Sequence, residues 1–66
     1  MPNNLEYYRK LRGISRPELA RIIGIDRSLI WRYENDKTRP RDQVKEKIAE
    51  ILDVSVEELF FKKTVA

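Results

Sequence analysis

The chain has 66 residues, a formal net charge of +3, and neither cysteine nor histidine. Its length allows a single domain, residues 1–66, near the lower size at which a hydrophobic core offsets conformational entropy without disulfides or metals. The missing residue types exclude disulfides and thiolate metal sites, and they remove the usual general base and the commonest metal ligand. No apolar run approaches the roughly 18 residues of a membrane span, and the start MPNNLEYYRK lacks the apolar core of a signal peptide. We therefore expect a cytoplasmic protein that is not an enzyme, has no metal or cofactor, and does not enter a membrane.

The charge is unevenly distributed along the chain. Residues 1–41 hold ten Lys and Arg against five Asp and Glu, whereas residues 42–66 hold four against six. Such asymmetry suggests a footprint for a polyanion, most simply nucleic acid, on one side of the fold. A solvated charged surface without a ligand would give the same counts, so charge alone leaves both interpretations open.

The first predicted helix spans about residues 4–12. Asn3 or Asn4 is its N-cap, and Gly13 ends it. The residues expected on its buried side are Leu5, Tyr8 and Leu11, with Ile14 following into the core.

The second predicted helix begins with the sequence SRPE. Ser15 is the N-cap, Glu18 completes a capping box, and Pro17 lies in the first turn, where its missing N–H costs little. Gly24 ends the helix, because glycine readily supplies a positive φ. The residues expected on its buried side are Leu19, Ala20 and Ile23.

A third helix is predicted over about residues 27–35, with Asp26 as its cap. Helical spacing turns Ile30 and Tyr33 away from an exposed face that holds the only tryptophan. The side chains on that face are Arg27, Ser28, Trp31, Arg32 and Asn35. We expect this face to have a ligand.

Two further helices follow the polar stretch NDKTRPR. The fourth, about residues 42–52, has its apolar stripe at Val44, Ile48, Ile51 and Leu52. A second capping box, Ser55 with Glu58, begins a short fifth helix that carries Val56, Leu59 and Phe60. No segment alternates with the period of two that a strand requires, so the predicted class is all-α, with a core over about residues 4–60 and a short tail, residues 61–66.

Helices two and three have the spacing of a helix-turn-helix. Ala20 supplies the small residue needed where the helices cross, Gly24 the permissive turn, and Ile30 the buried anchor. With these residues in place, ISRPELARIIGIDRSLIWRYENDKTRP resembles the helix-turn-helix of the phage Cro and repressor group, often called XRE-like regulators. The family segments appear in order as SRPELA, GIDRSLIWRY, END, KTRP and VSVEELF. The resemblance implies a compact five-helix, lambda-repressor-like domain that binds double-stranded DNA and regulates transcription.

The resemblance also implies roles for individual residues. Arg9 and Glu34 match an ion pair that braces the third helix, and Arg16 matches a position that approaches DNA at the backbone or an outer base. Base edges are faced by the positions of Arg27, Ser28 and Arg32, and phosphates by those of Asn35, Lys37, Thr38 and Arg39. Asp36 and Asp53 stand where the family pattern has glycine, and both are expected to cost a little stability.

The chemistry of these residues agrees with DNA recognition. The planar fork of arginine matches the O6 and N7 atoms of guanine, which makes Arg27 and Arg32 the predicted base readers. The flat face of Trp31 suits a sugar or a thymine methyl group, and packing against Lys or Arg stems would also explain its exposure. Tyr33 is expected in the core, with its hydroxyl at the surface.

Three functional interpretations remain open. The first is a repressor, acting as a homodimer on a pseudo-palindromic operator, because one short helix covers too few base pairs for useful specificity. The second is a controller-type transcriptional activator. The third is a protein-interaction module, such as an antitoxin or adaptor, and a regulatory protein partner is compatible with any of the three. The residues expected at a dimer interface are Leu59, Phe60, Phe61 and Val65.

Overall fold

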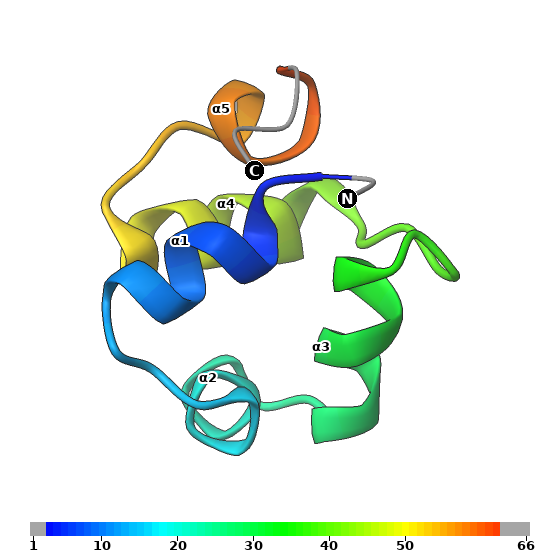
Figure 1. The fold of residues 1–66 in the computed structure, drawn as a ribbon. Coiled ribbons are helices and arrows are strands. Elements are labelled where there is room, and N and C mark those ends of the chain that lie inside the picture. The colour runs from blue at the N-terminus through cyan, green and yellow to red at the C-terminus, as the bar shows by residue number, and fades with distance from the viewer. Residues whose placement is uncertain (1–2, 63–66) are drawn as a thin grey trace.

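The computed structural model describes residues 3–62, which form five helices and no strand (Figure 1). The helices are α1 (Leu5–Leu11), α2 (Arg16–Ile23), α3 (Arg27–Glu34), α4 (Asp42–Leu52) and α5 (Val56–Phe60). The predicted all-α class is confirmed, and each helix lies within about one residue of its expected bounds. Over the same residues, no helix has the length and apolarity needed to cross a bilayer.

The predicted N-terminal caps of the later helices are present. The Ser15 Oγ accepts from the Glu18 N–H at 3.2 Å, and the Ser55 Oγ accepts from the Glu58 N–H at 3.0 Å. Asp26 caps α3 by accepting from the Ser28 N–H at 2.9 Å. These bonds satisfy N–H groups that have no partner inside a helix, and they fix where α2, α3 and α5 begin.

Four helices end in a left-handed residue. The positive φ values are 70° at Gly13, 88° at Gly24, 58° at Asp36 and 56° at Asp53. In each case the next N–H bonds to the carbonyl five residues earlier, from Ile14 to Arg9, Ile25 to Ala20, Lys37 to Arg32 and Val54 to Ala49. This is the Schellman pattern, in which glycine is usual because an L side chain resists positive φ. Two aspartates therefore occupy positions that favour glycine.

The core lies between the five helices. Helix α2 packs against α3 and α4, α1 packs against α3 and α5, and α4 packs against α5. In Figure 1, α2 and α3 occupy the side of the molecule opposite α5. The buried hydrophobic residues are Leu5, Leu19, Ala20, Ile23, Ile30, Tyr33, Ile48, Ala49, Leu52 and Leu59.

Two expectations for apolar residues are wrong. Leu11 was expected in the buried stripe of α1, but its side chain is 56% exposed, because the interior position one turn after Leu5 belongs to the buried Arg9. Leu59 was expected at a dimer interface, but it is fully buried in the core cluster and offers no surface to a second copy.

Candidate nucleic-acid interface

The helix-turn-helix is formed by α2 and α3. Ala20 is buried, Ile30 is fully buried, and Gly24 turns the chain between the helices with a φ of 88°. A Cβ built on Gly24 would meet nothing within 4 Å, so the backbone angle rather than crowding favours glycine here. Each of the three residues thus occupies the position expected from its spacing.

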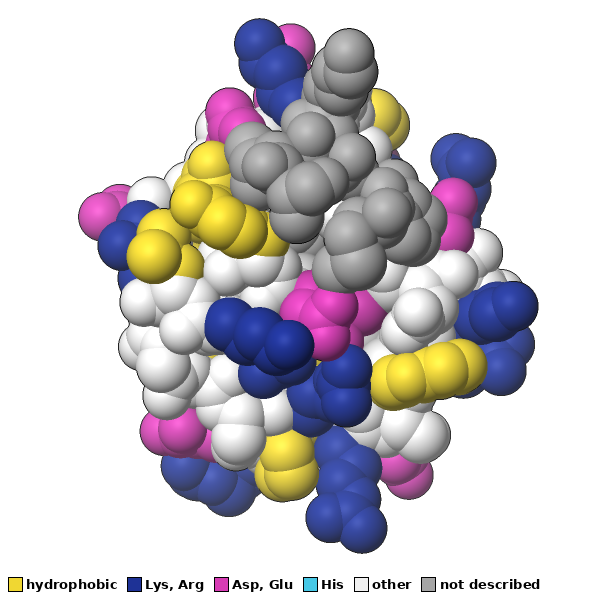
Figure 2. Space-filling model, viewed as in Figure 1, with side chains coloured by type: hydrophobic (Ala, Val, Ile, Leu, Met, Phe, Trp, Pro, Cys, Tyr) yellow, Lys and Arg dark blue, Asp and Glu magenta, His cyan; other side chains and the backbone are white. Residues whose placement is uncertain are grey.

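One face of α3 is turned outward over its whole length. The buried residues of the helix are Ile30, Tyr33 and Glu34. The side chains on the opposite face, all exposed, are Arg27, Ser28, Trp31 and Arg32, with Asn35 at the C-cap. Trp31 is 44% exposed, as expected. Figure 2 shows Lys and Arg side chains spread over the part of the surface formed by α2 and α3, with hydrophobic side chains among them.

A network of charged side chains holds the end of α3 against α1 and α2. The Arg9 Nε donates to one carboxylate oxygen of Glu34, and the Arg16 Nε donates to the other at 2.7 Å. The Glu34 side chain is 1% exposed, so its charge is desolvated and relies on these two guanidinium groups. The ion pair expected between Arg9 and Glu34 is therefore present, with a second cation beside it.

Arg16, which is expected to contact DNA, also has partners within the protein. Besides its bond to Glu34, its Nη2 donates to Glu6 Oε2 at 3.2 Å, and Glu6 in turn pairs with Lys10 at 3.3 Å. Sequence reasoning missed Glu6 and this bridging role of Arg16. The sequence did offer a signal for this role, because position 16 holds an arginine where the family pattern has glutamine. A cation at that position can pair with the buried Glu34 carboxylate, as Arg16 does here.

A groove runs between the start of α2 and the exposed face of α3. It encloses about 440 Å³ and is lined by Arg9, Ser15, Arg16, Pro17, Arg27, Ser28 and Trp31. The groove combines arginine side chains with the N-terminus of α2, where the helix dipole favours anions. A nearby carboxylate, that of Asp26, accepts from the N–H and hydroxyl of Ser28, and these bonds and the Arg27 charge keep its pKa below the usual value.

The loop after α3 is fastened to the helix by two side-chain bonds. The Asn35 Nδ2 donates to the Trp31 carbonyl at 2.9 Å, and the Arg32 Nε donates to Thr38 Oγ1 at 2.8 Å. Lys37 is exposed, whereas Thr38 is half-buried. Of the four residues expected to bind phosphate, Asn35 and Thr38 thus also form hydrogen bonds with α3.

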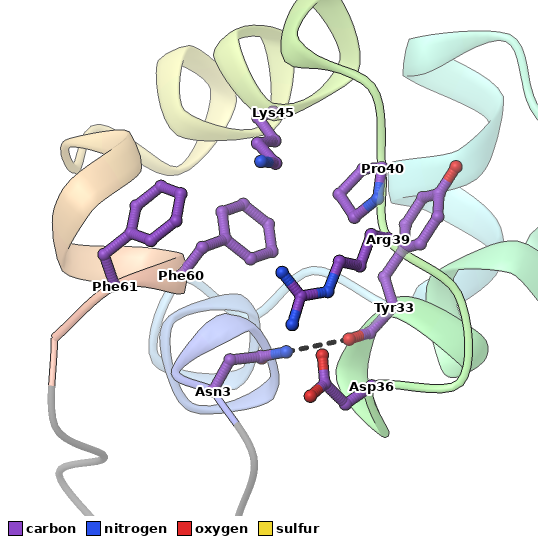
Figure 3. Close-up of a pocket in the computed structure, with 8 residues that line it drawn as sticks. All are labelled: Asn3, Tyr33, Asp36, Arg39, Pro40, Lys45, Phe60 and Phe61. Atoms are coloured by element: carbon purple, nitrogen blue, oxygen red, sulfur yellow. Dashed lines mark hydrogen bonds between the residues drawn. The ribbon is translucent and has the colours of Figure 1, made fainter.

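Arg39, the fourth of those residues, lies beside a hollow of about 310 Å³ between the loop and α5. Figure 3 shows its guanidinium directed into this hollow, near Asn3 and Phe60, while Asn3 Nδ2 donates to the Tyr33 carbonyl at 2.8 Å. In this conformation the Arg39 side chain is turned toward α5.

Two other residues expected at a dimer interface, Phe60 and Phe61, lie at the C-terminal end of α5. Phe60 is half-buried, and Phe61 is 64% exposed with its ring centroid 5.0 Å from the Lys45 Nζ. Val65 lies outside the described residues. An exposed phenylalanine next to a cation thus lies at this end of the fold.

The crossed α2 and α3, the glycine turn and the outward face of α3 define a helix-turn-helix protein. The chain belongs to the helix-turn-helix family, whose sequence pattern matches residues 5–59. This agrees with the resemblance found in the sequence.

Relatives of the chain carry a common description. This chain is 35% identical over 60 residues to an uncharacterized HTH-type transcriptional regulator of Methanocaldococcus jannaschii, and the alignment covers 91% of both chains. It is 40% identical over 60 residues to the HTH-type transcriptional regulator SinR of Bacillus subtilis, and to that of Bacillus licheniformis. That similarity covers 89% of this chain and 54% of SinR, so the chain spans about half the length of SinR.

Proposed function

We propose that this chain, a DNA-binding transcriptional regulator by family, is a repressor that binds a pseudo-palindromic operator as a homodimer in the cytoplasm. The observation that carries the proposal is the exposed face of α3, where Arg27, Trp31 and Arg32 stand together on a helix whose other side is anchored in the core. An α-helix of this kind fits the major groove, where each base pair presents a distinct pattern of donors and acceptors.

In this proposal, base recognition falls to Arg27 and Arg32, with Ser28 beside them. Both guanidinium groups are exposed and can present parallel N–H donors to guanine. Trp31 lies between them along the helix and also lines the groove toward α2, a place suited to contact with a sugar or a thymine methyl group. The charge network around Glu34 supports the proposal by holding α3 at a fixed angle to α1 and α2.

Phosphate binding is assigned to the start of α2 and to the loop after α3. Arg16 lies at the start of α2, and Asn35, Lys37 and Thr38 form the loop with Arg39. Cations and hydroxyl groups at these places would fix the register of the protein on the duplex without selecting its sequence. Arg39 would have to turn out of the hollow seen in Figure 3 to take part.

The proposed dimer uses the α5 end of the molecule. Phe60 and Phe61 both line the hollow beside Arg39, and Phe61 lines a second hollow of about 200 Å³ with Asp42, Lys45 and Glu46. Apolar rings flanked by both charge signs suit a self-complementary contact about a twofold axis. Two copies joined in this way would read half-sites about 34 Å apart.

The proposal is tested with the single tryptophan. Trp31 fluorescence is followed while the protein is titrated with a duplex from upstream of its own gene and with an unrelated duplex of equal length, each at two salt concentrations. We expect tighter binding to the first duplex and weaker binding to both at high salt. If neither duplex alters the fluorescence and a mobility assay also detects no complex, the DNA proposal fails and a protein partner becomes the better hypothesis.

A further inference from the structure

The loop after α3 forms hydrogen bonds with both the main-chain carbonyl and the side chain of Arg32. The Lys37 N–H donates to the Arg32 carbonyl at 2.8 Å, and the Arg32 Nε donates to Thr38 Oγ1, also at 2.8 Å. A side chain with four rotatable bonds is thereby fixed near its far end by a residue that the Schellman turn at Asp36 has already placed.

The bond to Thr38 leaves the rest of the Arg32 guanidinium available. Guanidinium has five N–H donors in a planar fork, and the Nε supplies one of them. With the Nε occupied, the two terminal Nη groups remain, and they are the pair that can approach O6 and N7 of guanine end-on. Fixing the fork before DNA arrives reduces the side-chain entropy that binding must remove.

Arg27 provides a contrast on the same face. Within residues 3–62, its side chain makes no hydrogen bond or ion pair, and it lies at the opposite end of α3 from the loop. Besides their places on the helix, the two arginines thus differ in how the guanidinium is held: that of Arg32 bonds to a neighbouring hydroxyl, and that of Arg27 does not.

We propose that Thr38 is a positioning residue that sets base discrimination by Arg32, in addition to any contact of its own with phosphate. The inference rests on the proposed function, because it assumes that Arg32 faces a base. A threonine hydroxyl has one donor and two acceptor sites, so accepting from Arg32 leaves its hydrogen free for a phosphate oxygen. Thr38 would then link the position of the backbone to the orientation of the base reader.

The test measures base preference at every operator position for the wild type and for Thr38→Val, Thr38→Ser, Arg32→Ala and the double variant Thr38→Val/Arg32→Ala. Valine keeps the branched shape and removes the hydroxyl, whereas serine keeps the hydroxyl. We expect Thr38→Val to reduce discrimination about three- to tenfold at the position whose preference Arg32→Ala abolishes, the size of one net hydrogen bond. Thr38→Ser restores it, and the position read by Arg27 keeps its preference in both variants.

The double variant separates positioning from phosphate contact. If Thr38 acts through Arg32, Thr38→Val causes no further loss of discrimination once Arg32 is alanine. If Thr38→Val instead weakens all duplexes alike, by the same factor with and without Arg32, then Thr38 is a phosphate contact only and the inference is overturned. A wild type that binds DNA without preferring any base would overturn the proposed function together with the inference.

A measurement without DNA examines the hydrogen bond itself. In the NMR spectrum, the Arg32 Nε–H should exchange with water more slowly and be more rigid than that of Arg27, and Thr38→Val should remove the difference. Melting temperatures of the variants show whether each one folds. An Arg32 Nε–H as mobile in the wild type as in the folded Thr38→Val variant would overturn the inference while leaving the proposed function untouched.

Discussion

Replacing Asp53 by glycine should stabilise the fold. Asp53 ends α4 with φ 56° and ψ 50°, a conformation that costs an L residue about 1–2 kcal/mol, with aspartate near the lower end. Its carboxylate also faces the negative end of the α4 dipole, which adds about 0.3–1 kcal/mol. Glycine relieves both and loses about 0.4–1 kcal/mol through the greater freedom of the unfolded chain. The net gain expected is about 1 kcal/mol.

Asp36 is the matched position at the end of α3, with φ 58° and the same hydrogen-bond pattern. Asp36→Gly should give a similar gain, since the backbone and dipole terms are the same. The two variants should differ in DNA binding, because Asp36 lies within the proposed phosphate-binding loop and Asp53 lies outside it. We therefore expect Asp36→Gly to bind DNA more tightly at low salt and Asp53→Gly to bind as the wild type does.

Thermal and urea unfolding measure the stability part, with an expected rise in melting temperature of about 4–8 °C per kcal/mol for a domain of this size. Asparagine at either position separates the two causes, since it removes the charge and keeps an L side chain at positive φ. Glycine variants no more stable than the asparagine variants would show that the positive φ carries no strain here. Equal gains in DNA affinity from Asp36→Gly and Asp53→Gly would place the loop away from the phosphates.

Three further predictions concern the charged side chains. Arg9→Ala should destabilise the fold by about 3–5 kcal/mol in urea unfolding, because Glu34 keeps a buried charge with one cation fewer; a loss below about 1 kcal/mol would mean that Arg16 alone suffices. In salt-dependent binding assays, Arg32→Ala should relax preference at one base position, whereas Lys37→Ala should weaken all duplexes alike and reduce the salt slope by about one unit; equal behaviour of the two variants would refute their separate roles. Because the pKa of Asp26 is lowered in the folded state, its ionised cap stabilises the fold above the usual Asp pKa of about 3.9, and this stabilisation is lost as the pH falls through the lower folded-state value. The difference in unfolding free energy between the wild type and Asp26→Asn should therefore shrink in acid. A difference that does not depend on pH would contradict this.

Much of the fold could be predicted because its signals are local. Capping at Ser15, Asp26 and Ser55 depends on residues two or three positions away, and each of these caps is present. The helix ends at Gly13 and Gly24 are also local, since one residue supplies the positive φ. Periodicity then gave the outward face of α3 without knowledge of its neighbours.

The failures concern contacts between helices. Leu11 fits the apolar stripe of α1, but the interior position in the last turn of the helix is taken by Arg9, which pairs with Glu34, and Leu11 is left exposed. Leu59 and Phe61 are both apolar residues of the last helix region, and only the packing of α5 on α1 and α4 decides that one is buried and the other exposed. A short helix with few residues gives periodicity too little length to make that choice.

Arg16 shows how one substitution changes the meaning of a neighbouring site. Where the family pattern has a neutral glutamine, this chain has a cation within 2.7 Å of a carboxylate that Arg9 also contacts. Two cations on one buried carboxylate would leave an uncompensated positive charge. The half-buried Glu6 supplies a second carboxylate, whose Oε2 lies 3.2 Å from the Arg16 Nη2. Arg16 can therefore contribute to DNA binding only with a charge already shared between two carboxylates. Removing it should change the salt dependence of binding less than removing Lys37, which has no such partner within residues 3–62. A salt slope reduced as much by Arg16→Gln as by Lys37→Ala would show that DNA displaces Glu6 and takes the guanidinium for itself.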